Sequence, residues 1–169
     1  MMTKNYVYRM DHDTGFAPHV YSNEFCSLIG CKPLIEKHAR PGGWVIGIGG
    51  NGTHKPDKLI YAMKVAENIP FEQFKKDYPK ESKYLVSQHA GKNVLISHEF
   101  YYLGDEAIDL PQGLKHIVIK YHGCKCITDE DVAKLSEHLI SKGYRHGKTG
   151  NPNNPTLISQ SSSEPCRTL

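Results

Sequence analysis

The sequence predicts an α+β domain built on a curved, mainly antiparallel β-sheet. Short runs of aromatic and β-branched residues recur along the chain, and they outnumber the segments with helical spacing. Turn residues separate these runs, as expected for strands joined by short loops. The 169 residues fit one domain with a buried core, and 38% hydrophobic with 23% charged residues disfavour disorder and coiled coil.

The first half of the chain is expected to hold three strands and one short helix. A loop of turn-forming residues follows the first strand, and a proline suited to a first helical turn opens the helix. The expected elements are a strand at 6–10, a loop at 11–18, a helix from near Pro33 to about residue 39, and strands at 44–48 and 59–67.

The second half is expected to alternate helices and strands. Phe71, Phe74 and Tyr78 have helical spacing, and Thr128 can cap a helix with acidic residues in its first turn. The expected elements are a helix at 70–78, an irregular segment at 84–93, strands at 94–103 and 114–121, and a helix from Thr128 to Gly143. We place the domain at residues 1–150, and we expect 151–169 to be a mobile tail rich in Asn, Pro and Ser.

The run from Gly47 to Gly52 fits the dinucleotide-binding pattern G-x-G-x-x-G. That pattern binds a pyrophosphate only when a helix opens directly from it. Here Pro56 and a second apolar run follow, so the sequence favours a β-hairpin whose Gly/Asn-rich loop accepts positive φ angles.

Charge and cysteine content set bounds on location and partners. The net charge of +3 permits binding to nucleotides or nucleic acid but does not indicate it. The chain has no apolar run of about 20 residues and no apolar signal-peptide core at its start. With an odd count of five cysteines, these features predict a cytoplasmic protein that is not associated with membranes.

Several groups of residues could carry chemistry. His122, Cys124 and Cys126 could bind zinc, but the spacing is poor for a structural site and buried free thiols are the favoured interpretation. Trp44, Tyr101 and Tyr102 could stack on a base, although aromatic residues on strands are more often core. No catalytic motif of a known type is present, so we expect neither cofactor nor metal, and a binding module is favoured over an enzyme.

The order of these motifs resembles a known family. The resemblance rests on six motifs. They are Tyr6-Val7-Tyr8 with the loop at residues 11–18, Cys31-Lys32-Pro33-Leu34-Ile35, and residues 43–49, 59–65, 94–104 and 147–152. The chain is similar in these motifs to the second nucleotide-modification-associated domain family of bacteria and their viruses. The resemblance implies a small β-barrel-like fold of the pseudouridine-synthase-and-archaeosine-transglycosylase (PUA) type, related to modified-base readers that hold a nucleobase beside the barrel. Gly42-Gly43 departs from related domains, which often have Gly-Asp there.

The leading hypothesis is noncatalytic recognition of a nucleotide or modified base, free or in DNA, linked to DNA base modification or to sequestration of a nucleotide signal. Aromatic stacking, polar loop groups and backbone donors would form the pocket. The expected ligand-binding residues are Asp11, Asp13, Phe16, Lys32, Trp44, Gly47, Gly49, Asn51, Ser97, Tyr101 and Tyr102. The alternatives are an enzyme acting on modified nucleotides through Cys31, His98 or Asp13, and a protein-interaction adaptor.

Overall fold

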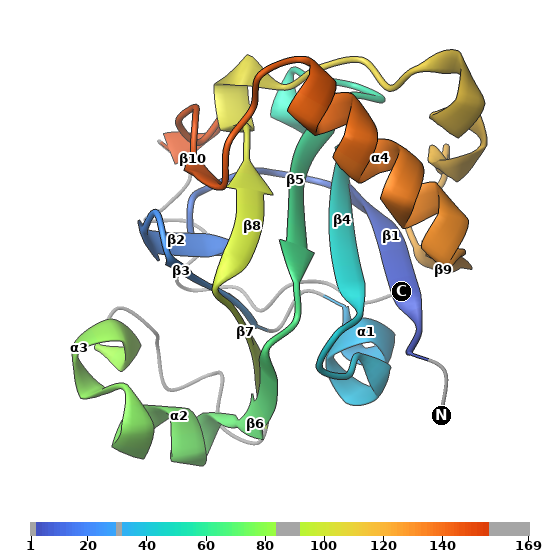
Figure 1. Ribbon diagram of the computed structural model, residues 1–169. Coiled ribbons are helices and arrows are strands. Elements are labelled where there is room, and N and C mark those ends of the chain that lie inside the picture. Colours follow the sequence, from blue (N-terminus) through green and yellow to red (C-terminus); the bar gives the residue numbers. More distant parts are fainter. Residues whose placement is uncertain (1–2, 30–31, 84–91, 156–169) are drawn as a thin grey trace.

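Two stacked β-sheets form the centre of the protein in the computed structural model, which describes residues 3–29, 32–83 and 92–155 (Figure 1). The strands are β1 (Asn5–Met10), β2 (His19–Ser22), β3 (Phe25–Ile29), β4 (Trp44–Gly49), β5 (Leu59–Lys64), β6 (Glu67–Pro70), β7 (Asn93–Ser97), β8 (Glu99–Tyr102), β9 (Cys124–Ile127) and β10 (Gly147–Lys148). The α-helices are α1 (Pro33–His38), α2 (Phe71–Asp77), α3 (Pro79–Ser82) and α4 (Asp129–Ser141). Short 3₁₀ helices occupy Asn51–Thr53, Gly104–Glu106 and Gln112–Ile117.

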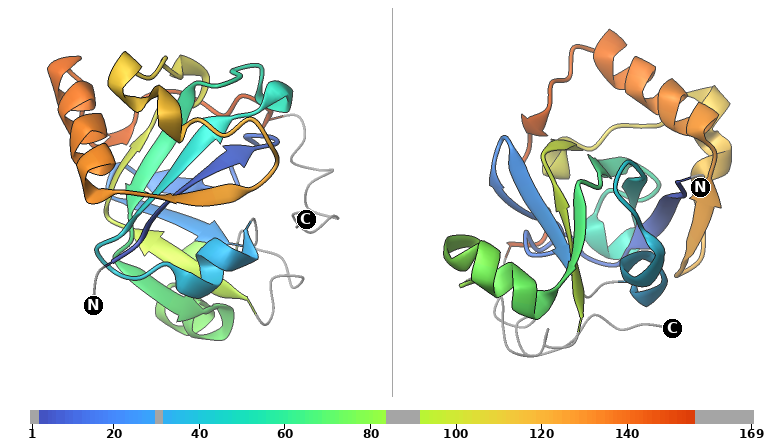
Figure 2. Two further views of the ribbon diagram at one scale, coloured as in Figure 1. Left: turned by 90° about the vertical axis from the view of Figure 1, so that its right-hand side faces the viewer. Right: turned by 60° about the horizontal axis from the view of Figure 1, so that its bottom comes forward.

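The sheets are mostly antiparallel, which confirms the predicted α+β class. The larger sheet has the order β10-β8-β5-β4-β1-β9, and the smaller has the order β2-β3-β7-β6. Only the β1–β4 and β10–β8 pairs are parallel among the ladders of the described strands. The chain passes between the sheets from β5 to β6 and from β7 to β8 (Figures 1 and 2). No ladder among the described strands closes the two sheets on each other, so a closed barrel stays a prediction.

Alternation along the strands separates two apolar layers. On β1, Tyr6, Tyr8 and Met10 face the smaller sheet, and Val7 faces the opposite side. The side chains between the sheets form one core, whereas Leu135 and Leu139 of α4 belong to the apolar cluster on the outer face of the larger sheet. Figure 1 shows α4 lying over that face. A third cluster joins α2 to the outer face of the smaller sheet. The order of layers is therefore helix, sheet, sheet, helix.

The helices follow their predicted signals. Pro33 opens α1, and Phe71 and Phe74 are buried on one side of α2. At α4, the Thr128 side chain accepts a hydrogen bond from the Asp131 N–H, and the Asp131 carboxylate accepts one from the Thr128 N–H. This reciprocal pair is a capping box, which satisfies N–H groups that have no partner within the helix.

Two strand predictions are wrong. The segment at 114–121 is not a strand, because Leu114 and Ile117 are buried from a 3₁₀ helix. The single strand predicted at 94–103 is two strands in different sheets, because the chain bends at His98, between β7 and β8. The Ser97 hydroxyl donates to the Glu99 carbonyl (2.9 Å) and accepts from the Glu99 N–H (3.2 Å), which fixes that turn.

No helix of the described part of the chain has the length and apolar character needed to cross a membrane.

Candidate functional site

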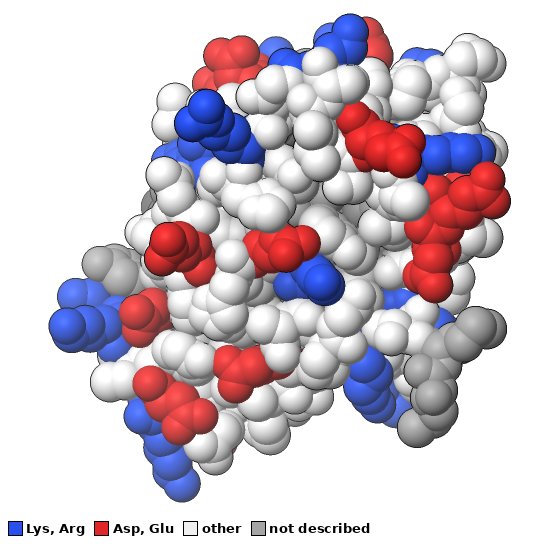
Figure 3. Space-filling model, in the orientation of Figure 1, with Lys and Arg blue, Asp and Glu red and all other residues white. Residues whose placement is uncertain are grey.

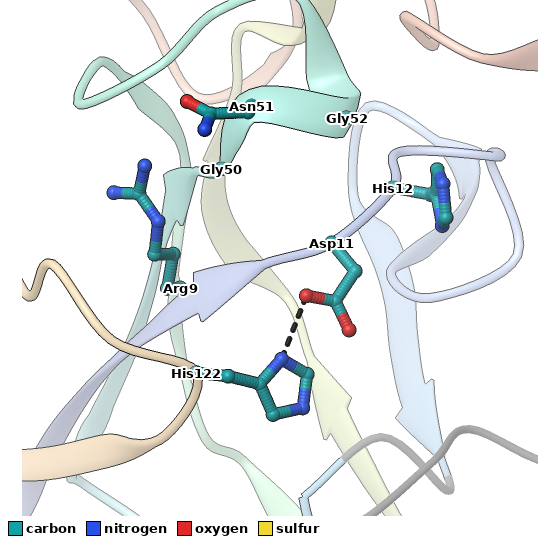
Figure 4. Close-up of a pocket in the computed structure, with 7 residues that line it drawn as sticks. All are labelled: Arg9, Asp11, His12, Gly50, Asn51, Gly52 and His122. Atoms are coloured by element: carbon teal, nitrogen blue, oxygen red, sulfur yellow. Dashed lines mark hydrogen bonds and ion pairs between the residues drawn. The ribbon is translucent and has the colours of Figure 1, made fainter.

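A pocket of about 400 Å³ opens at one end of the larger sheet, and most of the residues that line it are of polar types (Figure 4). It lies where β1 ends, beside the loop that follows β4 and the turn that precedes β9. The lining residues are Arg9, Asp11, His12, Gly50, Asn51, Gly52 and His122. Its volume falls within the range of about 300–1,000 Å³ typical of small-molecule sites.

Strand register brings these three segments together. Because β1 and β4 are parallel, their carboxyl ends reach the same edge of the sheet. β9 runs antiparallel to β1, with Cys124 opposite Tyr8, so the residues just before β9 also reach that edge. The Arg9 N–H donates to the Gly123 carbonyl (3.2 Å), which extends this pairing to the pocket wall.

The glycine run allows a close approach of two backbones. A Cβ atom at Gly50 would lie 2.5 Å from the Met10 carbonyl oxygen, and one at Gly52 would lie 2.3 Å from the Asp11 carbonyl oxygen. The loop can therefore rest against the end of β1 only if both residues lack a side chain. The expected hairpin between β4 and β5 is confirmed by their antiparallel pairing.

The expected reason for the glycines is wrong. In this loop the positive φ angles belong to His54 (63°) and Asp57 (65°), not to the glycines. Gly47 and Gly49 are needed for the same kind of close approach. A Cβ at Gly47 would lie 2.4 Å from the Tyr61 ring. One at Gly49 would lie 2.1 Å from the Lys55 carbonyl oxygen.

The Arg9 guanidinium is held in place at one side of the pocket. Its Nη1 donates to Asp57 Oδ1 (2.8 Å) and to the Ile119 carbonyl (3.0 Å), and its side chain is only 14% exposed. Lys120 also pairs with Asp57. The hydrogen bonds from Lys120 and Arg9 hold the pKa of the Asp57 carboxyl below its ordinary value. Asp57 therefore fixes the orientation of the Arg9 guanidinium at the pocket.

Asp11, His122 and Lys32 form a continuous hydrogen-bonded chain. His122 Nδ1 lies 2.7 Å from Asp11 Oδ1, and its Nε2 lies 3.2 Å from Lys32 Nζ (Figure 4 shows the first contact). A lysine ammonium can only donate, so Nε2 accepts and Nδ1–H donates to Asp11. This assigns a neutral imidazole whose orientation is fixed from both sides.

The opposite wall offers hydrogen-bonding groups without partners. Within residues 3–29, 32–83 and 92–155, no acceptor contacts the backbone N–H of Asn51 or Gly52. The Asn51 side chain is exposed, and the exposed His12 ring lies against Gly52. The pocket therefore presents free donors and an imidazole opposite the Asp11–His122 pair.

Asp13 and Tyr102, two further predicted site residues, belong to a buried network behind the pocket. Asp13 is fully buried and accepts hydrogen bonds from the Tyr102 hydroxyl (2.7 Å) and from the Asn153 N–H and side-chain amide (both 3.0 Å). Burial raises the pKa of Asp13, although these hydrogen bonds oppose the shift. Asn154 exchanges hydrogen bonds with the Asp13 backbone (2.8 Å each) and donates to the Gly52 carbonyl (2.9 Å). Residues 151–154 of the predicted tail therefore contact the domain, and residues 156–169 lie outside the described part of the chain.

The other predicted site residues are spread over the fold. Tyr101 is 4% exposed and packs with Trp44 in the core under α4, and its ring meets the His146 ring edge-on at 4.7 Å between centroids. Phe16 lies edge-on against His19 on the β2 side, and Ser97 is buried at the turn between the sheets. The pocket thus brings together Asp11, Asn51 and, through His122, Lys32. Its role as a site stays a prediction.

Sequence reasoning missed Arg9, His12 and, as a pocket residue, His122. In the sequence, His122 stands out only beside Cys124 and Cys126, as part of a poor zinc-site pattern. These cysteines are free, and the expectation of burial is wrong for Cys126, which is exposed. Within the described ranges no cluster of three metal-ligating side chains occurs. Cys31 lies outside the described residues.

Comparisons with known proteins identify the family. The family described as nucleotide modification associated domain 2 matches residues 2–84 and 75–159, and the chain belongs to it. None of the curated proteins matches the chain. Among solved structures, the crystal structure of ASCH from Zymomonas mobilis is similar over 79% of this chain and 94% of that one, with 13% identity and a TM-score of 0.41.

Proposed function

We propose that this domain recognises a phosphorylated nucleotide, or a modified base within one, in the pocket between the end of β1 and the loop after β4. The observation that carries the proposal is the convergence of an oriented guanidinium, open backbone N–H groups and two imidazoles on one small opening. Membership of a family associated with nucleotide modification supports the ligand class. The repeated passage of the chain between the two sheets, as from β5 to β6 and from β7 to β8, supports the finer prediction of a PUA-type barrel.

The charges at the pocket favour an anion. Arg9, Lys32 and Lys120 lie at or beside it, facing the carboxylates of Asp11 and Asp57. A guanidinium binds phosphate through paired N–H groups, and backbone amides add donors that cost no side-chain ordering. A phosphate placed between Arg9 and the 50–52 loop would therefore meet donors on both sides.

The remaining lining groups suit the edge of a base. Asp11 accepts, the Asn51 amide both donates and accepts, and the His12 ring offers a face for stacking. Trp44, Tyr101 and Tyr102 do not line this pocket, so stacking would depend on imidazole rather than on the expected rings.

Binding would be tested with a panel of nucleoside monophosphates, with and without base modifications, by isothermal titration calorimetry. We expect His12→Ala and Asn51→Ala to weaken binding about tenfold each, since stacking on a base contributes about 1–3 kcal/mol and a neutral hydrogen bond about 0.5–1.5 kcal/mol. The matched control is His38→Ala, because His38 is exposed at the end of α1, outside the pocket. Equal losses in all three variants, or no binding by the wild type, would refute the proposal.

Salt dependence separates a free nucleotide from a nucleic acid. Binding to a polymer weakens steeply with salt because counterions are released from many phosphates. At the pocket, Arg9, Lys32 and Lys120 lie beside the carboxylates of Asp11 and Asp57, and the face in Figure 3 also intersperses Lys and Arg with Asp and Glu. We therefore expect the shallow salt dependence of a small ligand.

A further inference from the structure

We propose that Lys32 is a nucleophile that captures an aldehyde-bearing nucleotide as a reversible imine, with His122 as its base and Asp11 as the group that orients that base. This inference rests on the proposed function and names the substrate class of the same site. It also adds Lys32 to the site, because Lys32 Nζ lies 3.2 Å from Nε2 of His122, which lines the pocket.

The geometry is that of an activated nucleophile. A nucleophile within hydrogen-bond reach of a base, with the base oriented by a third group, is the arrangement shared by catalytic triads. Here Lys32 Nζ lies 3.2 Å from His122 Nε2, and His122 Nδ1 lies 2.7 Å from Asp11 Oδ1. The His122 side chain is 23% exposed and lines the pocket, so it is partly shielded from solvent but still accessible from the pocket.

Lys32 Nζ contacts an imidazole rather than a carboxylate. No carboxylate of the described residues lies within 4.0 Å of its Nζ. A carboxylate would hold the amine as an ammonium, whereas an imidazole can take its proton and be stabilised as imidazolium by Asp11. Other charged or titratable groups at this cluster are Arg9 and Cys124.

The chemical step balances without a further reagent. The Lys32 ammonium transfers one proton to His122 Nε2, and its lone pair attacks the aldehyde carbon to give a carbinolamine. Proton transfer from the nitrogen to the hydroxyl, assisted by His122, releases water and leaves the C=N bond. Addition of water reverses each step, so the reaction holds the ligand without consuming it.

The aldehyde can come from two sources with the same chemistry: a formyl group on a base or the ring-opened sugar of an abasic site. The probes are 5-formyl-deoxycytidine monophosphate and an oligonucleotide with one abasic site, each incubated with the full chain and sodium cyanoborohydride. The reductant converts an imine into a stable amine, and peptide mass spectrometry identifies the modified lysine. Deoxycytidine monophosphate, which lacks an aldehyde, is the negative control.

We expect the adduct on Lys32 in preference to the other lysines, and its absence in Lys32→Arg, which keeps the charge but cannot form the imine. Lys37→Arg is the matched control, because Lys37 is exposed on α1 and lies close in sequence. His122→Gln should slow trapping about a hundredfold, the usual contribution of general acid–base catalysis. Asp11→Asn should slow trapping at saturating ligand, and Asp11→Glu should restore it, which a merely structural role would not do.

The outcomes separate this inference from the proposed function. If the wild type binds deoxycytidine monophosphate by calorimetry but modifies Lys32 no faster than Lys37, the inference is overturned and the proposed function stands. If the wild type binds no nucleotide and forms no preferred adduct, both fail. Preferential adduct on Lys32 from one probe alone supports the inference and identifies the source of the aldehyde.

Discussion

Replacing the buried carboxylate of Asp13 should reveal how strongly the C-terminal segment is tied to the domain. In Asp13→Ala, the Tyr102 hydroxyl and two Asn153 donors lose their acceptor. The Tyr102 hydroxyl is buried and would be left without a hydrogen-bond partner, whereas the half-buried Asn153 can hydrogen-bond to water instead. With about 1–3 kcal/mol for each buried donor left unsatisfied, the expected loss is about 2–3 kcal/mol.

The sign of the pH dependence follows from the raised pKa of Asp13, whose main cause is burial. A carboxyl with a folded-state pKa above its ordinary value of 3.8 stabilises the fold most when protonated. That contribution is present below pH 3.8 and is lost as the pH rises through the raised pKa. The destabilisation by Asp13→Ala should therefore be larger at pH 4 than at pH 7.

Urea and thermal unfolding of the wild type, Asp13→Ala and Asp13→Asn between pH 4 and pH 8 would measure this effect. For a chain of this length, the loss corresponds to a fall in Tm of about 4–12 °C. Asp13→Asn should lose less, since its side-chain oxygen still accepts one donor. Exposed Asp109→Asn is the control and should change stability by less than about 0.5 kcal/mol. A destabilisation that grows with rising pH would refute the reasoning, because it requires a lowered pKa.

Three further substitutions test the capping box of α4, the pocket loop at 50–52 and the hydrogen bond between Tyr78 and Glu67. Thr128→Ala removes the side-chain acceptor of the α4 capping box and should cost about 1 kcal/mol in urea unfolding. Gly52→Ala places a methyl group 2.3 Å from the Asp11 carbonyl oxygen, so we expect a loss of about 1–3 kcal/mol together with weaker nucleotide binding by calorimetry. The hydrogen bond to Glu67 and burial raise the pKa of Tyr78 to about 12, so the stabilisation lost in Tyr78→Phe should be present below pH 10 and absent near pH 12 by thermal unfolding.

Each of these has a matched comparison in the same chain. Thr128→Ser keeps the capping oxygen and should retain most of the stability. Gly113→Ala adds a methyl group where nothing lies within 4 Å, so equal effects at Gly52 and Gly113 would contradict the steric argument. Tyr121→Phe changes an exposed ring, and a pH dependence equal to that of Tyr78→Phe would remove the role given to the Glu67 pair.

The sequence was most informative where a local rule acts alone. The capping box of α4 and the proline that opens α1 depend on neighbouring residues, and both helices begin as predicted. The hairpin formed by β2 and β3 was missed, as was β6. These strands have four or five residues each, and pairing with distant β7 determines two of them. Such pairing leaves little local periodicity to detect.

The pocket was predictable only in part, for the same physical reason. Asp11 and Asn51 stood out because loop carboxylates and amides adjoin a glycine run. His122 is 111 residues from Asp11 along the chain, and only the antiparallel register of β9 on β1 brings it within 2.7 Å of the Asp11 carboxylate. Arg9 reads as an ordinary strand residue until Asp57, in a left-handed conformation, is seen to pair with it.

The glycine run and the buried Asp13 network are two parts of one support for the pocket. Gly50 and Gly52 let the loop rest on the end of β1, and Asn154 holds the same loop through its bond to the Gly52 carbonyl. Asn154 is in turn paired with the Asp13 backbone, two residues beyond Asp11. A shift of the C-terminal segment would therefore move both walls of the pocket together. On this basis the pattern that resembles a phosphate loop is a device for close backbone packing, and any phosphate it contacts meets donors positioned by that packing.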